Sequence, residues 1–168
     1  MIETSQPTDL PVRFADPCDM PQLMELCRAL HEENGWFEMS EQKVHDMLMH
    51  HYERTGGVIG VIGPPDELQG AIVMQMSTMW YSEQWHLEEL FSFVPPQFRR
   101  SENAKKLIDF AKKCAVDIGV PLLIGIISNE RTEAKVGLYR RKLGKPVGAF
   151  FVANDIVRSP AVNQESVS

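Results

Sequence analysis

The chain has 168 residues, of which 43% are hydrophobic and 24% are charged, and its formal net charge is −6. These values are typical of one globular domain with an ordinary core. No apolar run approaches the about 20 residues that a membrane span needs, which argues against a membrane protein. The acidic balance argues against a general nucleic-acid binder. Because the first residues lack the pattern of a signal peptide, we expect a cytoplasmic protein.

The cysteines and histidines give no sign of a disulfide framework or a metal site. Cys18, Cys27 and Cys114 are odd in number and widely spaced, which predicts reduced thiols. His45 and His50 are five residues apart and therefore lie on different faces of a helix. Since the chain has neither H-E-x-x-H nor a Cys/His ligand set, we expect no metal.

The N-terminal part is predicted to contain a leader, a strand and two helices. Residues 1–11 form a flexible leader in this prediction, and residues 12–15 favour a short strand. Asp19 can cap a first helix that ends near Gly35, and Ser40 can cap a second one. Both predicted helices carry apolar residues at helical spacing.

The middle of the chain changes from helical to strand periodicity. Three segments rich in Val, Ile, Met and aromatic residues are separated by turn-forming residues and predict an antiparallel meander, over 57–63, 70–79 and 85–94.

The C-terminal part alternates helices and strands. A helix over 102–118 is stopped by Gly119, and the apolar run at 122–127 is typical of a strand covered on both faces. A further helix over 132–144 and a final strand over 147–153 follow. The polar tail, residues 155–168, is expected to be disordered.

These elements predict one α/β (α+β) domain over residues 12–154. Their order is β-α-α-β-β-β-α-β-α-β, which favours a three-layer domain in which a mixed sheet of about six strands is flanked by four helices. The chain shows no internal repeat and no linker to a second domain.

Basic residues crowd the predicted start of the helix at 102. Arg99, Arg100, Lys105 and Lys106 lie where the helix already carries about half a positive charge. Such cations are well placed if an anion binds among them, and the free backbone N–H groups of a helix start hold phosphates well. A solvated basic turn is the alternative.

Two segments resemble the GNAT superfamily of acyl-CoA-dependent N-acetyltransferases. Val94-Pro95-Pro96-Gln97-Phe98-Arg99 is similar to the V-x-P-x-Y-R stretch that leads into the family's pyrophosphate loop, R-x-x-G-x-G/A, which here begins at Arg99. Leu138-Tyr139-Arg140-Arg141-Lys142-Leu143-Gly144 is similar to the family's L-Y-x-x-x-G helix, with one extra residue. The resemblance covers residues 12–154.

The resemblance implies direct transfer of an acetyl group from acetyl-CoA to a primary amine, in a small molecule or a peptide. Tyr139 would be the general acid that protonates the departing thiolate, and an ordinary core tyrosine is the alternative. The strand that ends near residue 94 would splay from the next one and leave backbone groups for the pantetheine amides. The implied cofactor-binding residues are Ser92, Val94, Arg99, Arg100, Ser101, Glu102, Asn103, Ala104, Lys105 and Asn129.

The base that takes the proton of the amine is predicted to be a carboxylate of the strand before this loop. Glu88 and Glu89 are adjacent, and alternation along a strand allows only one to face the site. We assign the role to Glu89. His86, or water without a dedicated base, remains an alternative.

Two positions depart from the family pattern. Glu102 replaces the first loop glycine and places a carboxylate near the expected phosphates, although an acid also suits a helix start. Thr132 replaces an asparagine that often precedes the tyrosine by seven residues, so its contact is lost or passes to Asn129.

Aromatic and acidic residues gather in two segments that could form the acceptor pocket. Trp36, Trp80 and Trp85 are among them, together with Glu33 and Glu83, and this mixture would suit a cationic amine. An exposed rim or a homodimer surface is the plainer interpretation. The alternative function is a non-catalytic acyl-CoA-binding or protein-interaction module, which Glu102 motivates, and a nucleic-acid-binding domain disagrees with the net charge.

Overall fold

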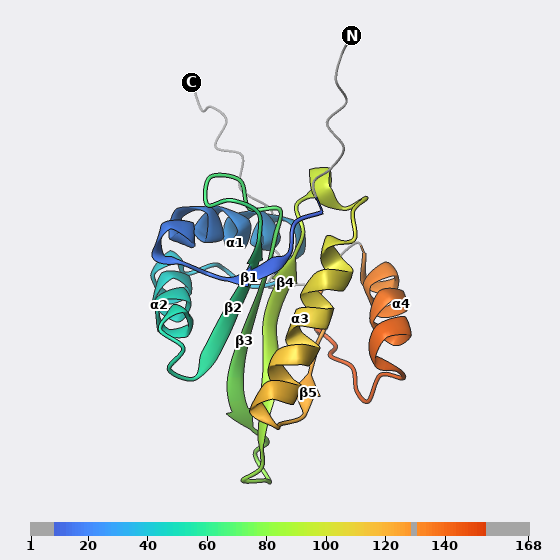
Figure 1. Cartoon of the computed structure of the whole chain (residues 1–168). Helices are drawn as coiled ribbons and strands as arrows, with labels where there is room; N and C mark the ends of the chain where they lie inside the picture. The colour runs from blue at the N-terminus through green and yellow to red at the C-terminus, as the bar shows by residue number, and fades with distance from the viewer. Residues whose placement is uncertain (1–8, 129–130, 154–168) are drawn as a thin grey trace, which may run out of the picture.

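A computed structural model of the chain describes residues 9–128 and 131–153 (Figure 1). The helices are α1 (Met20–Asn34), α2 (Glu41–Tyr52), α3 (Asn103–Ile118) and α4 (Thr132–Leu143), and short 3-10 turns lie at Pro17–Asp19 and Pro96–Phe98. The strands are β1 (Val12–Phe14), β2 (Gly57–Ile62), β3 (Gly70–Thr78), β4 (Trp85–Phe93) and β5 (Leu122–Leu123).

The strands form one mixed sheet in the order β1-β2-β3-β4-β5. Strands β2, β3 and β4 pair antiparallel, which confirms the predicted meander; β1 also pairs antiparallel with β2, and β5 is parallel to β4. Helices α1 and α2 cover one face and α3 covers the other (Figure 1). The predicted three-layer α/β domain is therefore confirmed, with five strands in the described residues instead of about six.

Helix α3 shows why these sequence patterns give this fold. Leu107, Ile108, Ala111 and Ala115 recur at helical spacing and are all buried against the sheet. Gly119 ends the helix in the left-handed conformation, with φ of 81°, which glycine adopts without a steric penalty. One apolar stripe and one glycine thus place the start of α3 at the end of β4.

The sequence predicted that the Asp19 side chain caps α1, but it forms no such hydrogen bond in the structure. Its fully buried carboxylate accepts hydrogen bonds from the Arg13 guanidinium at 2.7 and 2.8 Å and from the Asp16 backbone N–H at 2.7 Å. Burial favours the protonated acid, but these hydrogen bonds hold the pKa of Asp19 below its usual value. Asp19 therefore joins β1 to the start of α1, and Ser40 caps α2 as expected, accepting from the Lys43 N–H.

The strand predicted at 122–127 is much shorter than expected. Only Leu122 and Leu123 pair with β4, and the rest of the apolar run is half-buried or exposed. No described strand pairs with the outer edge of β5, so the run lies at the edge of the sheet, and none of its residues is fully buried as a strand covered on both faces would be. A continuous apolar run suits an edge as well as a buried strand, which is why the pattern misled the prediction.

The final strand predicted at 147–153 is absent from the described residues. This segment has no regular structure, and Val147 and Phe151 are more than nine-tenths exposed. Apolar alternation gives a segment strand propensity, but a strand also needs a partner edge, and none is paired to it here.

Other expectations concern the ends of the chain and its thiols. Cys27 and Cys114 are buried, Cys18 is exposed, and all three are free thiols, as predicted. Most of the predicted leader and the whole predicted tail lie outside the described residues, so the domain limits stay predictions. No helix in the described part is long and apolar enough to cross a membrane, and the described residues hold no cluster of metal-ligating side chains.

Candidate active site

A bulge in β4 gives this strand its functional side. Opposite β3, Glu89 pairs with Met74 and Phe91 pairs with Val73, so Leu90 is an extra residue in β4. Before the bulge, Leu87 lies in the core beneath α3, and after it Phe93 lies in the core beneath α1 and α2. The bulge therefore brings Glu89 and the residues at 92 and 94 to the same face of the sheet, the face that carries α3.

The edge of β4 is free beyond its middle. Pairing with β5 ends at Glu88 and Leu123, whereas β4 continues to Phe93. Along residues 89–93, the backbone groups on this edge have no partner strand among the described residues. Such an edge can accept another extended chain through main-chain hydrogen bonds.

Tyr139 and Glu89 meet beside this free edge. The Tyr139 hydroxyl on α4 donates a hydrogen bond to Glu89 Oε1 at 3.2 Å. Glu89 Oε2 is buried and has no hydrogen-bond partner in the described part of the chain. A buried carboxylate oxygen without a donor is costly, and such groups are concentrated at functional sites.

The environment shifts the pKa of both groups in the same direction. Burial raises the pKa of Glu89 to about 7, although the Tyr139 hydrogen bond and the charge of Lys135 oppose this shift. Burial also raises the pKa of Tyr139 far above its ordinary value, and the charge and hydrogen bond of Glu89 add to this effect. Glu89 can therefore exchange a proton near neutral pH, while Tyr139 keeps its own proton.

The neighbouring carboxylate, Glu88, lies on the opposite face of β4. One of its carboxylate oxygens accepts a hydrogen bond from Gln75 Nε2 at 3.1 Å, and the other lies within hydrogen-bond distance of His86 Nε2, at 3.2 Å. Alternation along the strand thus separates the two acids, and Glu89 is the one beside Tyr139. His86 is buried and faces Glu88, so the structure does not place it beside Tyr139.

A cavity of about 190 Å³ opens beside the Tyr139 hydroxyl. The end of β4, the start of α3 and one side of α4 supply most of its wall, and α1 adds Glu33. Its lining comprises Glu33, Ser92, Phe93, Val94, Arg99, Ala104, Arg131, Ala134, Lys135, Leu138 and Tyr139. Five predicted site residues, Ser92, Val94, Arg99, Ala104 and Tyr139, therefore surround one cavity.

Arg99 lies in this cavity, but the protein itself already holds its guanidinium. Its Nε donates to the Val94 carbonyl at 2.9 Å, and a terminal nitrogen donates to Glu33 Oε2 at 2.5 Å. Arg99 also lies over the Phe93 ring, 5.5 Å from its centre. The sequence predicted Arg99 as a phosphate ligand, whereas the structure shows it joining α1 to the end of β4.

The first turn of α3 leaves two backbone N–H groups available, although the loop before it uses most of its own. The Ser101 hydroxyl donates to the Phe98 carbonyl and accepts from the Asn103 N–H. The N–H groups of Ala104 and Lys105, in the first turn of α3, have no carbonyl partner in the described residues. They are the groups that an anion at this helix start would meet.

Several side chains that were expected near the phosphates bind other groups of the protein. Glu102 is exposed and forms an ion pair with Lys105, so its carboxylate neutralises one of the loop cations. The buried Asn103 amide reaches the Gln69 carbonyl at 3.4 Å and so packs the helix start on the loop before β3. Lys106 donates to the Leu10 carbonyl, and Arg100 is exposed.

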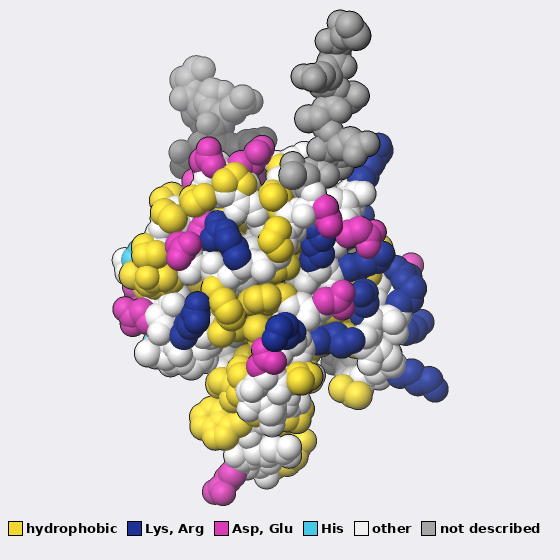
Figure 2. Space-filling model, viewed as in Figure 1, with side chains coloured by type: hydrophobic (Ala, Val, Ile, Leu, Met, Phe, Trp, Pro, Cys, Tyr) yellow, Lys and Arg dark blue, Asp and Glu magenta, His cyan; other side chains and the backbone are white. Residues whose placement is uncertain are grey.

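Helix α4 supplies cavity residues that the sequence analysis did not identify. Lys135 lies one turn before Tyr139, and Arg131, the residue just before α4, lies two turns before it; the spacing i, i+4 and i+8 puts all three on the same side of the helix. That spacing from the predicted tyrosine was a signal that could have found them. An ion pair between Lys142 and Asp109, at 2.9 Å, joins α4 to α3, and Figure 2 shows Lys and Arg side chains gathered over these two helices. Asn129 lies outside the described residues.

The predicted acceptor pocket of aromatic residues is not assembled. Trp80, Tyr81 and Trp85 belong to the β3–β4 hairpin, are more than half exposed, and line neither described cavity. Figure 1 places this hairpin and helix α1 at opposite ends of the sheet, and Figure 2 shows hydrophobic side chains on the projecting hairpin. The expectation was wrong because it joined segments by composition, while the length of the strands separates them.

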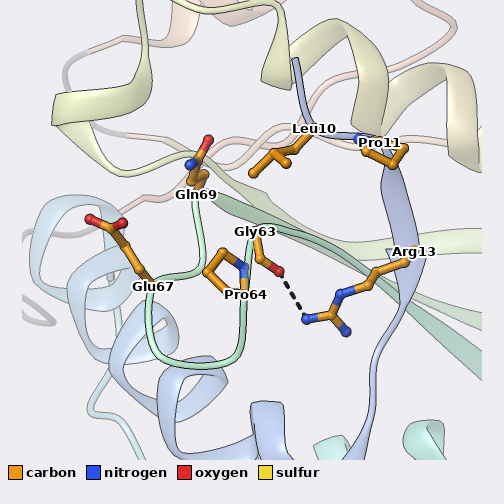
Figure 3. A pocket seen from close by; sticks show the side chains of 7 residues that line it. All are labelled: Leu10, Pro11, Arg13, Gly63, Pro64, Glu67 and Gln69. Carbon is orange, nitrogen blue, oxygen red and sulfur yellow. Dashed lines mark hydrogen bonds between the residues drawn. The ribbon is translucent and has the colours of Figure 1, made fainter. Parts of the chain in front are cut away.

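A larger hollow of about 530 Å³ lies elsewhere, between β1 and the loop that joins β2 to β3 (Figure 3). Its one cation, Arg13, donates to the Gly63 carbonyl at 2.9 Å and to buried Asp19. Because its lining contains no pair of acid–base groups in contact, this hollow is a weaker candidate for catalysis than the cavity beside Tyr139.

Several solved structures share this fold. AAC(6')-Iy, solved with a bisubstrate analogue, CoA-S-monomethyl-acetylneamine, is 12% identical with a TM-score of 0.68, and the match covers 86% of this chain and 97% of the other. An aminoglycoside acetyltransferase from an uncultured soil metagenomic sample, in complex with sisomicin, is 17% identical with a TM-score of 0.60, and the match covers 86% of this chain and 93% of the other. A GNAT-family acetyltransferase from Staphylococcus aureus is 13% identical with a TM-score of 0.59, and the match covers 86% of this chain and 98% of the other.

The sequence itself matches no protein-family model and no curated protein. The structural likeness covers most of each chain at low identity, and it shows that this chain has the fold of the GNAT acetyltransferases.

Proposed function

We propose that the chain is an N-acetyltransferase that moves an acetyl group from acetyl-CoA to a primary amine by direct attack. The observation that carries the proposal is the hydrogen bond between Tyr139 and Glu89, in a cavity between the free edge of β4 and the start of α3. Acyl transfer to an amine needs a group that takes a proton and a group that gives one, and this pair can do both.

The described residues fit acetyl-CoA as a substrate. The free N–H groups of Ala104 and Lys105 would hold the diphosphate, with Arg100 and Ser101 beside them. The free edge of β4, which includes Ser92, would receive the pantetheine amides, whereas the carbonyl of Val94 just beyond it is already held by Arg99. The exposed carboxylate of Glu102 is paired with Lys105, and the diphosphate would take its place on the Lys105 ammonium. When bound, acetyl-CoA supplies a carbonyl carbon that is already activated as a thioester.

The hydrogen-bonded pair can work as a proton relay. Glu89 in its ionised form accepts a proton from the amine as the amine attacks the carbonyl carbon. Protonation of Glu89 removes the negative charge that helps to hold the pKa of Tyr139 high. Tyr139 can then give its proton to the departing sulfur and recover one from Glu89 through their hydrogen bond. The net result is one proton moved from nitrogen to sulfur.

Arg99 acts as a positioning residue in this proposal. By binding Glu33 of α1 and the Val94 carbonyl at once, it fixes the distance between α1 and the strand that receives the substrate. The amine acceptor would enter beside α1. Aminoglycosides belong to the acceptor candidates because two proteins of the same fold were solved with sisomicin or an acetylneamine analogue.

The test is release of the CoA thiol in the presence of a panel of amines: aminoglycosides, polyamines, and peptides with free N-termini or lysines. We expect at least one amine to give turnover, and we expect Tyr139→Phe and Glu89→Gln each to reduce it by about 10² or more. Glu88→Gln, on the opposite face of β4, is the matched control and should retain most of the turnover.

The alternative function is a non-catalytic acyl-CoA-binding module. It is favoured by the loop glycine replaced by Glu102. This alternative predicts that the protein binds CoA but releases no thiol with any amine, and that outcome would overturn the enzymatic proposal. A homodimer and a cytoplasmic location stay predictions from the sequence.

A further inference from the structure

Lys135 is a charged cavity residue that the relay does not use. It lies on α4 one turn before Tyr139 and lines the same cavity, which Ser92 and Val94 also line. Its side chain is half-buried. A lysine in such a position normally pairs with a carboxylate or extends into solvent.

The charged groups around Lys135 do not neutralise it. Arg99 and Arg131 face it with positive charge, and Glu33 and Glu89 face it with negative charge. Glu33 is already paired with Arg99 at 2.5 Å, and Glu89 accepts from Tyr139. No ion pair or hydrogen bond joins the Lys135 ammonium to another side chain in the described part of the chain. The cavity thus contains a primary amine that is held near the proposed base and is not bound to it.

We propose that Lys135 is itself an acetyl acceptor, so that the protein acetylates its own Lys135 Nζ from acetyl-CoA. This inference rests on the proposed function, because it needs the acyl thioester and the relay at the same site. Lys135 has the chemistry that the proposed external acceptor must have: a primary amine, within the cavity, on the same side of α4 as Tyr139.

The environment also favours the neutral, nucleophilic form of this amine. Burial lowers the pKa of Lys135 below its ordinary value; Arg99 and Arg131 act in the same direction, while Glu33 and Glu89 oppose them. A larger fraction of Lys135 is therefore neutral at a given pH than of an exposed lysine, and only the neutral amine can attack.

The step balances with acetyl-CoA as the only co-reactant. After the ammonium has lost one proton to solvent, the Nζ lone pair forms a bond to the thioester carbonyl carbon, and the carbon–sulfur bond breaks with its electron pair on sulfur. The nitrogen loses a second proton to Glu89, and the sulfur takes one from Tyr139. The products are a neutral acetyl-lysine and free CoA. The modification removes one positive charge from the cavity and fills part of its volume.

The experiment incubates the full chain with acetyl-CoA and no added amine, then measures acetylation of each lysine by peptide mass spectrometry over time. We expect Lys135 to be modified at least tenfold faster than Lys112, an exposed lysine on α3 that reports the uncatalysed reaction. Because the reaction is intramolecular, its rate constant should not change when the protein is diluted tenfold. Tyr139→Phe should slow modification of Lys135 to near the Lys112 rate.

Two variants complete the design. Lys135→Arg keeps the charge and should abolish the fast modification, while Lys112→Arg should leave it intact. Equal rates at Lys135 and Lys112, or a Lys135 rate unchanged in Tyr139→Phe, would overturn the inference. If external amines are acetylated while Lys135 is not, the inference fails and the proposed function stands. If acetyl-CoA neither binds nor reacts, both fail.

Discussion

Replacing Glu89 by glutamine should change how the stability of the protein depends on pH. Glutamine keeps the shape of the side chain and can still accept the Tyr139 hydrogen bond, but it carries no charge at any pH. Burial raises the pKa of Glu89 from 4.5 to about 7 in the folded chain. Between these two pH values the folded protein keeps a proton that the unfolded chain has lost.

The magnitude follows from this difference. The raised pKa means that the contribution of Glu89 to wild-type stability is fully present below pH 4.5 and is lost as the pH rises through the folded pKa of about 7. At about 1.4 kcal/mol per pKa unit, the decline attributable to Glu89 is about 3 kcal/mol. Glu89→Gln does not show this decline. The melting temperature of Glu89→Gln minus that of wild type should therefore increase by about 6–12 °C between pH 4.5 and pH 8, for a chain of this size.

The assay is thermal or urea unfolding of both proteins across this pH range. Taking the difference between variant and wild type cancels the other titrating groups. Glu88→Gln removes a charge from the adjacent, half-exposed position and shows whether the gain belongs to the buried carboxylate. A difference between Glu89→Gln and wild type that stays constant from pH 4.5 to 8 would refute the claim that Glu89 is buried and its pKa raised.

Three further predictions concern the relay, the N-terminal ion pair and the thiols. The ratio of wild-type to Glu89→Gln acetyl-transfer rates should rise with pH up to about 7 and then level, because Glu89 accepts a proton only when ionised; a flat ratio in stopped-time assays would count against it as the base. Asp19→Asn should cost about 3 kcal/mol in urea unfolding, since Arg13 loses its buried partner, while exposed Asp16→Asn should cost under about 1 kcal/mol. Iodoacetamide should label exposed Cys18 well before Cys27, because burial raises the pKa of the Cys27 thiol to about 12; equal labelling, measured by mass spectrometry, would contradict this.

Segments with regular apolar spacing that end at a glycine or a turn-forming residue were predicted well. Helix α3 was expected over 102–118 and spans Asn103–Ile118, because its apolar stripe and Gly119 act locally. The three strands of the meander were found within one or two residues of their predicted ends. Alternation along the strand also implied that only one of Glu88 and Glu89 faces the site, and the structure places the two side chains on opposite faces of β4.

Features that depend on distant partners were not predictable in the same way. The strands at 122–127 and 147–153 required neighbours at the sheet edge, which a local pattern does not reveal. The Arg99–Glu33 ion pair joins residues 66 positions apart, so nothing near Arg99 in the sequence indicated that its guanidinium would be occupied. The bulge at Leu90 likewise depends on the pairing of β4 with β3.

Calorimetric titration with acetyl-CoA tests the central claim most directly. Ala104 lies in the first turn of α3 and lines the cavity, so Ala104→Glu would place a carboxylate where the diphosphate is expected. Val116→Glu adds the same charge at an exposed position near the other end of this helix. We predict that wild type and Val116→Glu bind acetyl-CoA alike and that Ala104→Glu binds at least tenfold more weakly. No binding by the wild type, or equal binding by all three proteins, would contradict the account.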